Sequence, residues 1–337
     1  MKKQNPIKRL FGIRGMGGAI TAFVGLIIIY IAFGIINPTV FSGQNIMNLL
    51  RSMSKYLIIG IGQSYVLITG NIDLSIGSVV GMSAMITATL MTMGVSPMAA
   101  ILISFVCCMV IGVLNGILVG KWKLPPFIAT LGTMFVARGI AYMVNGNRNT
   151  DAISSGVGKD AAETFQNVFY YGKTLGIYNT FWIAIIIFAA FFFLLSKTRT
   201  GRHIYAIGSN VDAAKLSGVS VVATTTKTYL VSAFCSFVVG LILCGQAGMG
   251  NMEAGNMYEM YAVAAGVIGG ISPLGGTGIL LGTLAGASVW QTLENGLNMI
   301  GAQVGIQRLV IGIIVVFAVL LDVVVRNGVF KKKAPSK

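Results

Sequence analysis

Long apolar runs, separated by shorter polar stretches, dominate the sequence. A helix that crosses the hydrocarbon core of a bilayer needs roughly 20 predominantly apolar residues, because each residue adds only about 1.5 Å along the helix axis. The pattern therefore predicts an all-α, polytopic membrane protein with about ten transmembrane helices. The predicted helices cover residues 17–37, 56–70, 74–93, 96–120, 126–144, 179–196, 225–248, 258–271, 277–300 and 305–325.

Two of these predicted helices are short and end in glycine-containing polar segments. The run 56–70 leads into residues 70–73 (Gly-Asn-Ile-Asp), and the run 258–271 leads into residues 269–276 (Gly-Gly-Ile-Ser-Pro-Leu-Gly-Gly). A helix rich in small residues follows in each case, and the two pairs have similar places in the two halves of the chain. Paired interruptions of this kind indicate an internal repeat with broken helices near a transport path. Ordinary tight turns between helices are the alternative.

The composition agrees with a membrane location and excludes nucleic acid as a partner. Hydrophobic residues make up 55% of the chain and charged residues 10%, whereas a soluble domain carries about 25% charged residues. The net charge of +15 comes from basic clusters between the apolar runs, as the positive-inside rule predicts for a protein embedded in lipid. Aromatic residues do not alternate with these clusters as they do in RNA-binding proteins.

The basic clusters also predict the topology. Counting crossings from the basic N-terminus places residues 121–123, the segment 197–224 and the C-terminal lysines on one side, which is the cytoplasm. Both termini are then cytoplasmic, and the segment 145–178, which carries mixed charge, becomes an outer loop. Arg51 and Lys55 conflict with this count, because they fall on the outer side. Either they belong to an interfacial helix or the count is wrong there.

Residues suited to catalysis or metal binding are scarce. The single histidine, His203, lies in a basic loop, and the four cysteines lie in apolar runs without metal-ligand spacing. No Walker A motif is present, so the chain is not expected to bind ATP by that route or to be an enzyme, and we expect no cofactor. An ion-coupled secondary transporter is an alternative function. It would need a coupling residue inside the membrane, and Asp73, Glu259 and Glu294 are the candidates.

Two further patterns concern single positions. Asp73 precedes Leu-Ser-Ile-Gly and is suited to cap the next helix, and Arg138 lies deep enough in a predicted helix to need a partner or a water-filled path.

The basic loop 197–224 predicts a short helix of its own, which Ser209 or Asn210 can cap and Gly218 can end. A two-turn helix presented to the cytoplasm is too small to fold alone, so we expect it to dock into another protein. A loop that only sets the topology is the alternative.

Several stretches together resemble the permease subunits of bacterial ABC importers for simple sugars, the ribose, xylose and galactoside group. They are Asn-Ile-Asp-Leu-Ser-Ile-Gly from residue 71, Pro-Phe-Ile-Ala-Thr-Leu-Gly-Thr-Met from 126, the loop motifs within 198–218, and Gly-Gly-Ile-Ser from 269 with the following Gly-Gly. The resemblance covers about residues 40–325. The related carriers of autoinducer-2 are also similar. Ser209 stands where this family typically has Gly.

The resemblance implies that residues 1–337 form one transmembrane permease domain in the bacterial inner membrane. Two permease copies would form the pathway, a separate cytoplasmic ATPase would supply energy, and a periplasmic or extracellular sugar-binding protein, docked on the outer loop, would deliver the substrate. The segment around 209–218 would be the coupling helix that sits in a cleft of the ATPase, and its expected contact residues are Ser209, Asn210, Asp212, Ala213, Ala214, Leu216 and Gly218. Candidate pathway residues are Gln63, Ser64, Asn71, Asn115, Thr130 and Thr133. The structural motifs of the two interruptions are Asp73, Ser75 and Gly77, and Gly269, Gly270, Gly275 and Gly276.

Overall fold

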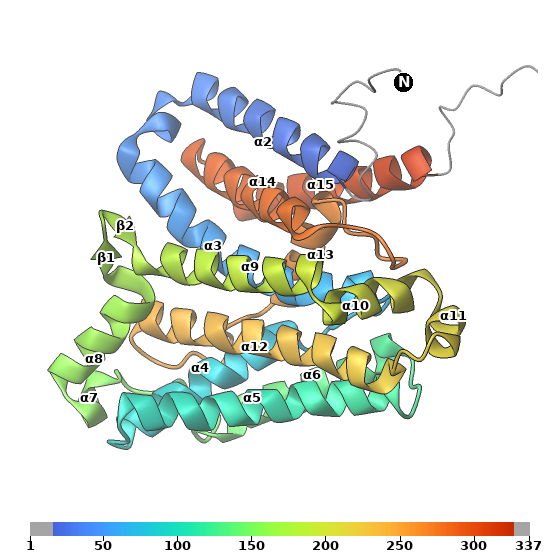
Figure 1. Cartoon of the computed structure of the whole chain (residues 1–337). Helices are drawn as coiled ribbons and strands as arrows, with labels where there is room; N and C mark the ends of the chain where they lie inside the picture. Colours follow the sequence, from blue (N-terminus) through green and yellow to red (C-terminus); the bar gives the residue numbers. More distant parts are fainter. Residues whose placement is uncertain (1–15, 327–337) are drawn as a thin grey trace, which may run out of the picture.

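The computed structural model describes residues 16–326, which are almost entirely helical (Figure 1). Within that range the strands are β1 (Lys173–Thr174) and β2 (Ile177–Tyr178), which pair antiparallel. The helices are α2 (Met16–Ile36), η1 (Pro38–Phe41), α3 (Gly43–Ile68), α4 (Ile76–Thr92), α5 (Pro97–Gly120), α6 (Pro126–Met143), α7 (Ser154–Val157), α8 (Lys159–Gln166), η2 (Asn167–Tyr171), α9 (Asn179–Lys197), α10 (Arg199–Ser209), α11 (Val211–Leu216), α12 (Val221–Ala247), α13 (Tyr258–Ile268), α14 (Leu280–Met299) and α15 (Val304–Arg326).

All ten predicted membrane segments correspond to helices, which are α2 to α6, α9 and α12 to α15. Of the described helices, α2, α5, α6, α9 and α12 are long and apolar enough to cross a membrane by length and composition. Helix α12 is 67% buried over its most apolar stretch, whereas α2 is only 17% buried. Since the exposed surface of such helices is itself apolar, the molecule suits lipid as its surrounding solvent. The predicted all-α polytopic membrane fold is thus confirmed.

Helices α3, α4 and α12 form the centre of the bundle. Helix α12 packs against α3, α4 and α5, while α14 packs against α2, α3 and α13. Along α3, every residue from 56 to 68 is buried, and α4 is buried over nearly its whole length. Between them, these two helices contact α5, α6, α9, α12, α13 and α14, so a displacement of either one would affect most of the bundle.

Helix α3 differs from the prediction. The apolar pattern predicted a short helix over 56–70, but the helix runs for 26 residues from Gly43 to Ile68. Its polar first half is accommodated by specific partners: Ser42 accepts a hydrogen bond from the Asn45 amide at the helix start, and the Asn45 side chain pairs with Asn295 of α14 at 3.1 Å. Arg51 and Lys55 belong to this half. The polar residues therefore extend the helix instead of interrupting it.

Helix α13 is short, as predicted. Its 11 residues span about 16 Å, which is roughly half of the hydrocarbon thickness. The loop that follows it meets the end of α3, where the Gly276 amide donates to the Ile68 carbonyl at 2.8 Å. Gly275 and Gly276 both have positive φ, at +87° and +72°, a conformation that glycine adopts without steric cost. The two predicted interruptions thus come together at one place in the molecule.

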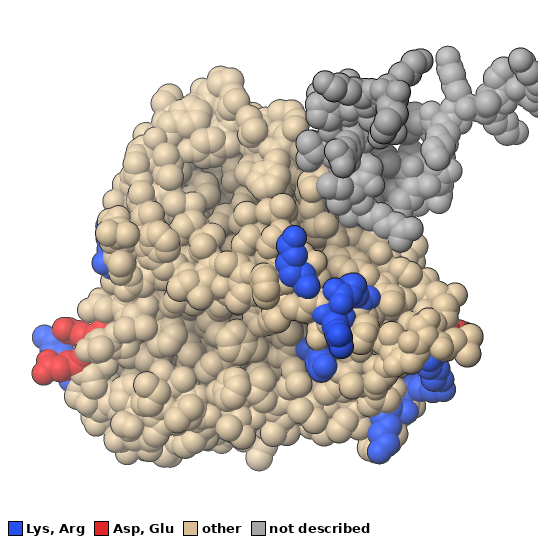
Figure 2. All heavy atoms as spheres, in the orientation of Figure 1, with Lys and Arg blue, Asp and Glu red and all other residues tan. Residues whose placement is uncertain are grey.

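The two ends of the bundle differ in their charged side chains. Figure 2 shows most visible Lys and Arg near α10 and α11, whereas most visible Asp and Glu lie, together with some basic side chains, at the opposite end, where α7 and α8 lie in Figure 1. This distribution agrees with the predicted placement of segments 197–224 and 145–178 on opposite sides. The basic clusters of the two termini, on which the cytoplasmic placement of both ends relied, lie outside the described residues.

Candidate functional site

The basic loop contains two consecutive helices, α10 and α11. Asn210 separates them, and its side-chain oxygen accepts a hydrogen bond from the Ala213 amide at 2.8 Å, so that Asn210 is the N-cap of α11. Asp212 lies in the first turn, and Gly218 follows the helix with φ +80°. The predicted two-turn helix is confirmed, with Asn210 as its cap instead of Ser209. The eleven-residue helix α10 before it was not predicted.

The tip of α11 presents apolar groups to solvent. Leu216 is 91% exposed and Val211 is 44% exposed, whereas Ala214 is buried against the rest of the protein. Asp212 and Ala213 are also exposed. Helix α11 is thus held to the rest of the protein through Ala214 and leaves Leu216 almost fully exposed.

Helix α10 rests directly on the place where the two interruptions meet. A methyl group added at Gly208 would collide with the Ile68 carbonyl at the end of α3 and with the Gly276 amide, and one added at Gly276 would lie 3.0 Å from the Cα of Ser209. Tyr205 also donates a hydrogen bond to the Gly278 carbonyl at 2.7 Å. Burial raises the pKa of Tyr205 to about 12, so the hydroxyl keeps this proton at neutral pH.

Five of the six candidate pathway side chains have hydrogen-bond partners among the described residues. Ser64 pairs with Thr283 at 2.7 Å, Asn71 donates to Thr69, and Thr130 donates to the Pro126 carbonyl. Gln63 is fully buried in α3. Neither polar atom of its side chain has a hydrogen-bond partner within the part of the chain that the structure describes.

Asn115 and Thr133 belong to a buried polar network that starts at Asp73. The Asp73 carboxylate accepts hydrogen bonds from the Ser75 amide and hydroxyl and from the Ser232 hydroxyl. Asn115 donates to Ser75 at 3.0 Å and accepts from Thr133 at 2.6 Å. Ser75 is the N-cap of α4, so the expectation that Asp73 caps this helix is wrong. Instead, Asp73 fixes the turn before α4 and joins it to α12.

Gly269 and Gly270 allow the backbone at the end of α13 to lie directly against α14 and α2. An added methyl group at Gly269 would collide with the Gly282 carbonyl of α14, and one at Gly270 would lie 2.7 Å from the Cα of Gly18 in α2. Small residues of this kind allow the backbones of membrane helices to approach closely. The second interruption is therefore tightly packed between α14 and α2.

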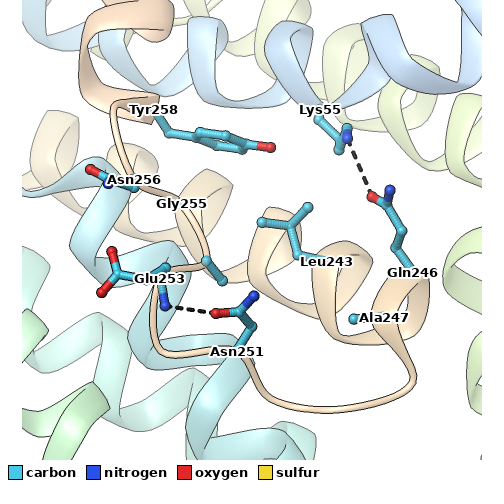
Figure 3. Close-up of a pocket in the computed structure, with 10 residues that line it drawn as sticks. Lys55, Leu243, Gln246, Ala247, Asn251, Glu253, Gly255, Asn256 and Tyr258 are labelled. Atoms are coloured by element: carbon cyan, nitrogen blue, oxygen red, sulfur yellow. Dashed lines mark hydrogen bonds between the residues drawn. The ribbon is translucent and has the colours of Figure 1, made fainter. Parts of the chain in front are cut away.

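A pocket with polar and apolar lining opens at the other end of the bundle, between α3, the end of α12 and the loop before α13 (Figure 3). We call it the Lys55 pocket. It is an open pocket with a volume of about 450 Å³. In Figure 3 the Tyr258 ring lies across from Leu243, and its hydroxyl points toward the side where Lys55 donates to Gln246 at 3.3 Å. The lining residues are Lys55, Leu243, Gln246, Ala247, Asn251, Glu253, Ala254, Gly255, Asn256 and Tyr258.

Two residues from other parts of the chain, Arg138 and Thr150, bind the backbone around the Lys55 pocket. Arg138 of α6 donates to the carbonyls of Met252 and Ala254 at 2.8 and 2.9 Å and to that of Gly77 at 3.3 Å. Arg138 therefore has the partner that its depth in a predicted helix required. Thr150 of the segment 145–178 also exchanges hydrogen bonds with Gly250 through its amide and hydroxyl.

The segment 145–178 also encloses Arg51, one turn before Lys55 on α3. The Arg51 guanidinium lies 4.5 Å from the ring centre of Tyr170 and 4.1 Å from that of Tyr178, which are cation–π distances. Tyr171 donates to the Gln246 carbonyl at 2.9 Å. The two cations that conflicted with the crossing count thus belong to α3, at the end of the bundle where segment 145–178 lies.

The Lys55 pocket was not predicted from the sequence, because it forms only where the fold brings Lys55 of α3 against the segment 243–258, which supplies the other lining residues. Lys55 stood out only as a conflict in the topology. The available signal was the position of Lys55 directly before the apolar run 56–70. A cation at such a position requires a polar or aqueous partner, which indicates a polar site nearby.

Comparison with known proteins gives one family and a consistent set of relatives. The family described as "Branched-chain amino acid transport system / permease component" matches residues 45–319. The chain is 38% identical over 300 residues to the ribose import permease protein RbsC of Bacillus subtilis, which covers 89% of this chain and 91% of the relative. It is 33% identical over 302 residues to the D-allose transport system permease protein AlsC of Escherichia coli (89% and 90% covered).

A third relative has a different sugar in its name. The galactose/methyl galactoside import permease protein MglC of Salmonella typhimurium is 35% identical over 299 residues, with 85% of this chain and 88% of the relative covered. No solved structure matches the chain.

Proposed function

Because the chain belongs to the branched-chain amino acid transport system / permease component family, in the group of ABC permeases that import simple sugars, we propose that it forms the translocation pathway for a monosaccharide or related small polyol. It is a permease subunit of a sugar importer and a multi-pass protein of the inner membrane. In this proposal residues 1–337 act as one permease domain, and two copies of it enclose the pathway. Gln63, buried and without a partner in the described residues, is the pathway candidate that the geometry favours most.

The proposed energy source is a separate cytoplasmic ATPase. The observation that carries this part of the proposal is the contact of α10 with both interruptions: Gly208 and Ser209 lie directly on Ile68 and Gly276. Docking of the ATPase on α11 would displace α10. Since α10 touches the end of α3 and the loop between α13 and α14, such a displacement reaches both parts of the pathway at once.

The opposite end would receive the sugar-binding protein. Segment 145–178 with α7, α8, β1 and β2 forms the surface there, and its mixed charge suits docking of a soluble protein. In this proposal α10, α11 and both termini face the cytoplasm.

The test is to isolate the protein gently from its native membrane and to identify the subunits that accompany it. We expect a stoichiometric ATPase. After reconstitution of that complex together with its binding protein in vesicles, uptake of D-ribose, D-allose or D-galactose should depend on ATP and persist when an ionophore dissipates ion gradients. A chain that purifies alone and whose uptake stops with the ionophore would contradict the proposal and would favour ion coupling through Asp73, Glu259 or Glu294.

A further inference from the structure

We propose that the Lys55 pocket is a transient binding site for a neutral monosaccharide or polyol as it enters the pathway from the end of the bundle that carries segment 145–178. This inference rests on the proposed function, because it names the place where the delivered sugar first contacts the permease. This open pocket of about 450 Å³ is in the size range of small-molecule sites, about 300–1,000 Å³.

The polar groups of the pocket match hydroxyl groups. Three amide side chains line it, from Gln246, Asn251 and Asn256. An amide offers both donors and an acceptor, and a sugar hydroxyl likewise donates and accepts, so each amide can bind hydroxyls in either orientation. The Lys55 ammonium adds donors next to Gln246, at the 3.3 Å contact between the two side chains.

The charges of the pocket favour a neutral ligand. One cation, Lys55, and one carboxylate, Glu253, belong to the lining, so the formal charges cancel. The Glu253 carboxylate accepts a hydrogen bond from Tyr142 at 2.7 Å, and Figure 3 shows it directed away from Lys55. A phosphate would meet the single lysine without a second cation, and a metal ion would meet the single carboxylate. Neither ligand would find the several charges that usually bind it.

Tyr258 supplies an aromatic surface for the apolar face of a sugar ring. Its ring lies 6.0 Å from that of Tyr56 and 5.6 Å from that of Tyr261, centre to centre, so neighbouring rings fix its orientation. A tyrosine combines an apolar ring with a polar hydroxyl, and the ring face attracts polarised C–H bonds. Across from it, Leu243 adds a second apolar surface (Figure 3).

The position of the pocket suits the transfer of a delivered sugar. The pocket borders α3, whose buried stretch from residue 56 to 68 follows Lys55 directly and contains Gln63. Tyr171 and Thr150 of segment 145–178 bind the backbone at Gln246 and Gly250. A protein docked on that segment would therefore release its sugar beside the pocket.

The experiment uses the complex purified from its native membrane into lipid nanodiscs. Ligand-observed saturation-transfer NMR is recorded with D-ribose, D-allose and D-galactose in turn, on the natural protein and on Lys55→Met and Gln246→Met. Both substitutions preserve side-chain length and remove hydrogen-bonding groups. Gln44→Met is the matched control, since Gln44 is an exposed glutamine at the start of the same helix and outside the pocket.

We expect saturation transfer to at least one sugar, weakened about threefold or more in each pocket variant and unchanged in the control, in line with loss of one or two hydrogen bonds. ATP-driven uptake should show a lower maximal rate at an unchanged half-saturating concentration, because the binding protein sets the latter.

Equal thermal unfolding midpoints establish that the variants fold, and if Lys55→Met does not accumulate, Gln246→Met carries the test. Unaltered signals in the folded variants, or no signal in a complex that imports sugar, would overturn the inference. Loss of ATP dependence alone would overturn only the proposed function.

Discussion

At the scale of single residues, Arg138 holds the loop that forms one wall of the Lys55 pocket. Its guanidinium satisfies three backbone carbonyls at once. We expect Arg138→Met to lower the free energy of unfolding by about 2–3 kcal/mol, because the carbonyls lose charge-assisted hydrogen bonds. Hydrogen exchange should accelerate in residues 251–257. Arg148→Met, at an exposed arginine, is the control and should change neither quantity. Equal exchange in the two variants would show that Arg138 does not hold the loop.

The sequence identified Arg138 as a residue in need of a partner, but the partner could not be predicted. Every residue has a backbone carbonyl, so the sequence does not indicate which carbonyls the guanidinium binds. One of them belongs to Met252, more than a hundred positions away. Asp73 shows the same limit. The sequence marked it as a cap because of local spacing, whereas its second oxygen binds Ser232 of a distant helix. At these positions the local chemistry can be predicted from the sequence, but the long-range contact that determines their role cannot.

At the scale of elements, α11 carries the prediction on coupling. Leu216→Glu places a charge on the 91% exposed tip of the helix. The permease should fold as before, while the amount of ATPase that co-purifies falls about tenfold, because a buried apolar anchor at an interface becomes charged. Leu175→Glu, at an 87% exposed leucine of the opposite end, is the matched control and should retain the ATPase. Full retention in Leu216→Glu would exclude α11 as the docking element.

The boundaries of the elements were predictable where hydrophobicity alone decides them. Helices α5, α6 and α9 begin and end within a residue of the predicted ranges. Helix α3 was predicted 13 residues too short at its start, because Asn45, Arg51 and Lys55 interrupt the apolar pattern. The structure compensates these polar groups through Asn295, two tyrosine rings and Gln246. Helix α10 was not predicted for a related reason: its basic first half precedes an apolar run of only four residues, 204–207, in a loop too polar for a membrane segment.

At the scale of the whole molecule, α3 links the two ends that the proposal assigns to partners. Arg51 near its start is held between Tyr170 and Tyr178 of segment 145–178. Its last residue, Ile68, accepts a hydrogen bond from Gly276 and lies against Gly208. A single continuous helix thus touches the proposed binding-protein surface, the Lys55 pocket and the proposed coupling segment. Docking at either end can then bias the position of the same element.

This linkage predicts the effect of filling the contact between α10 and α3. Gly208→Ala would press a methyl group against the Ile68 carbonyl and the Gly276 amide, both of them backbone groups that cannot rotate away. We expect ATP-driven uptake to fall by about tenfold, since overpacking typically costs about 1–3 kcal/mol. The ATPase should still co-purify, because α11 itself is unaltered. Gly139→Ala, at a helical glycine of α6 with open space around it, is the control and should import normally. Normal uptake in a folded Gly208→Ala protein would mean that coupling does not pass through this contact.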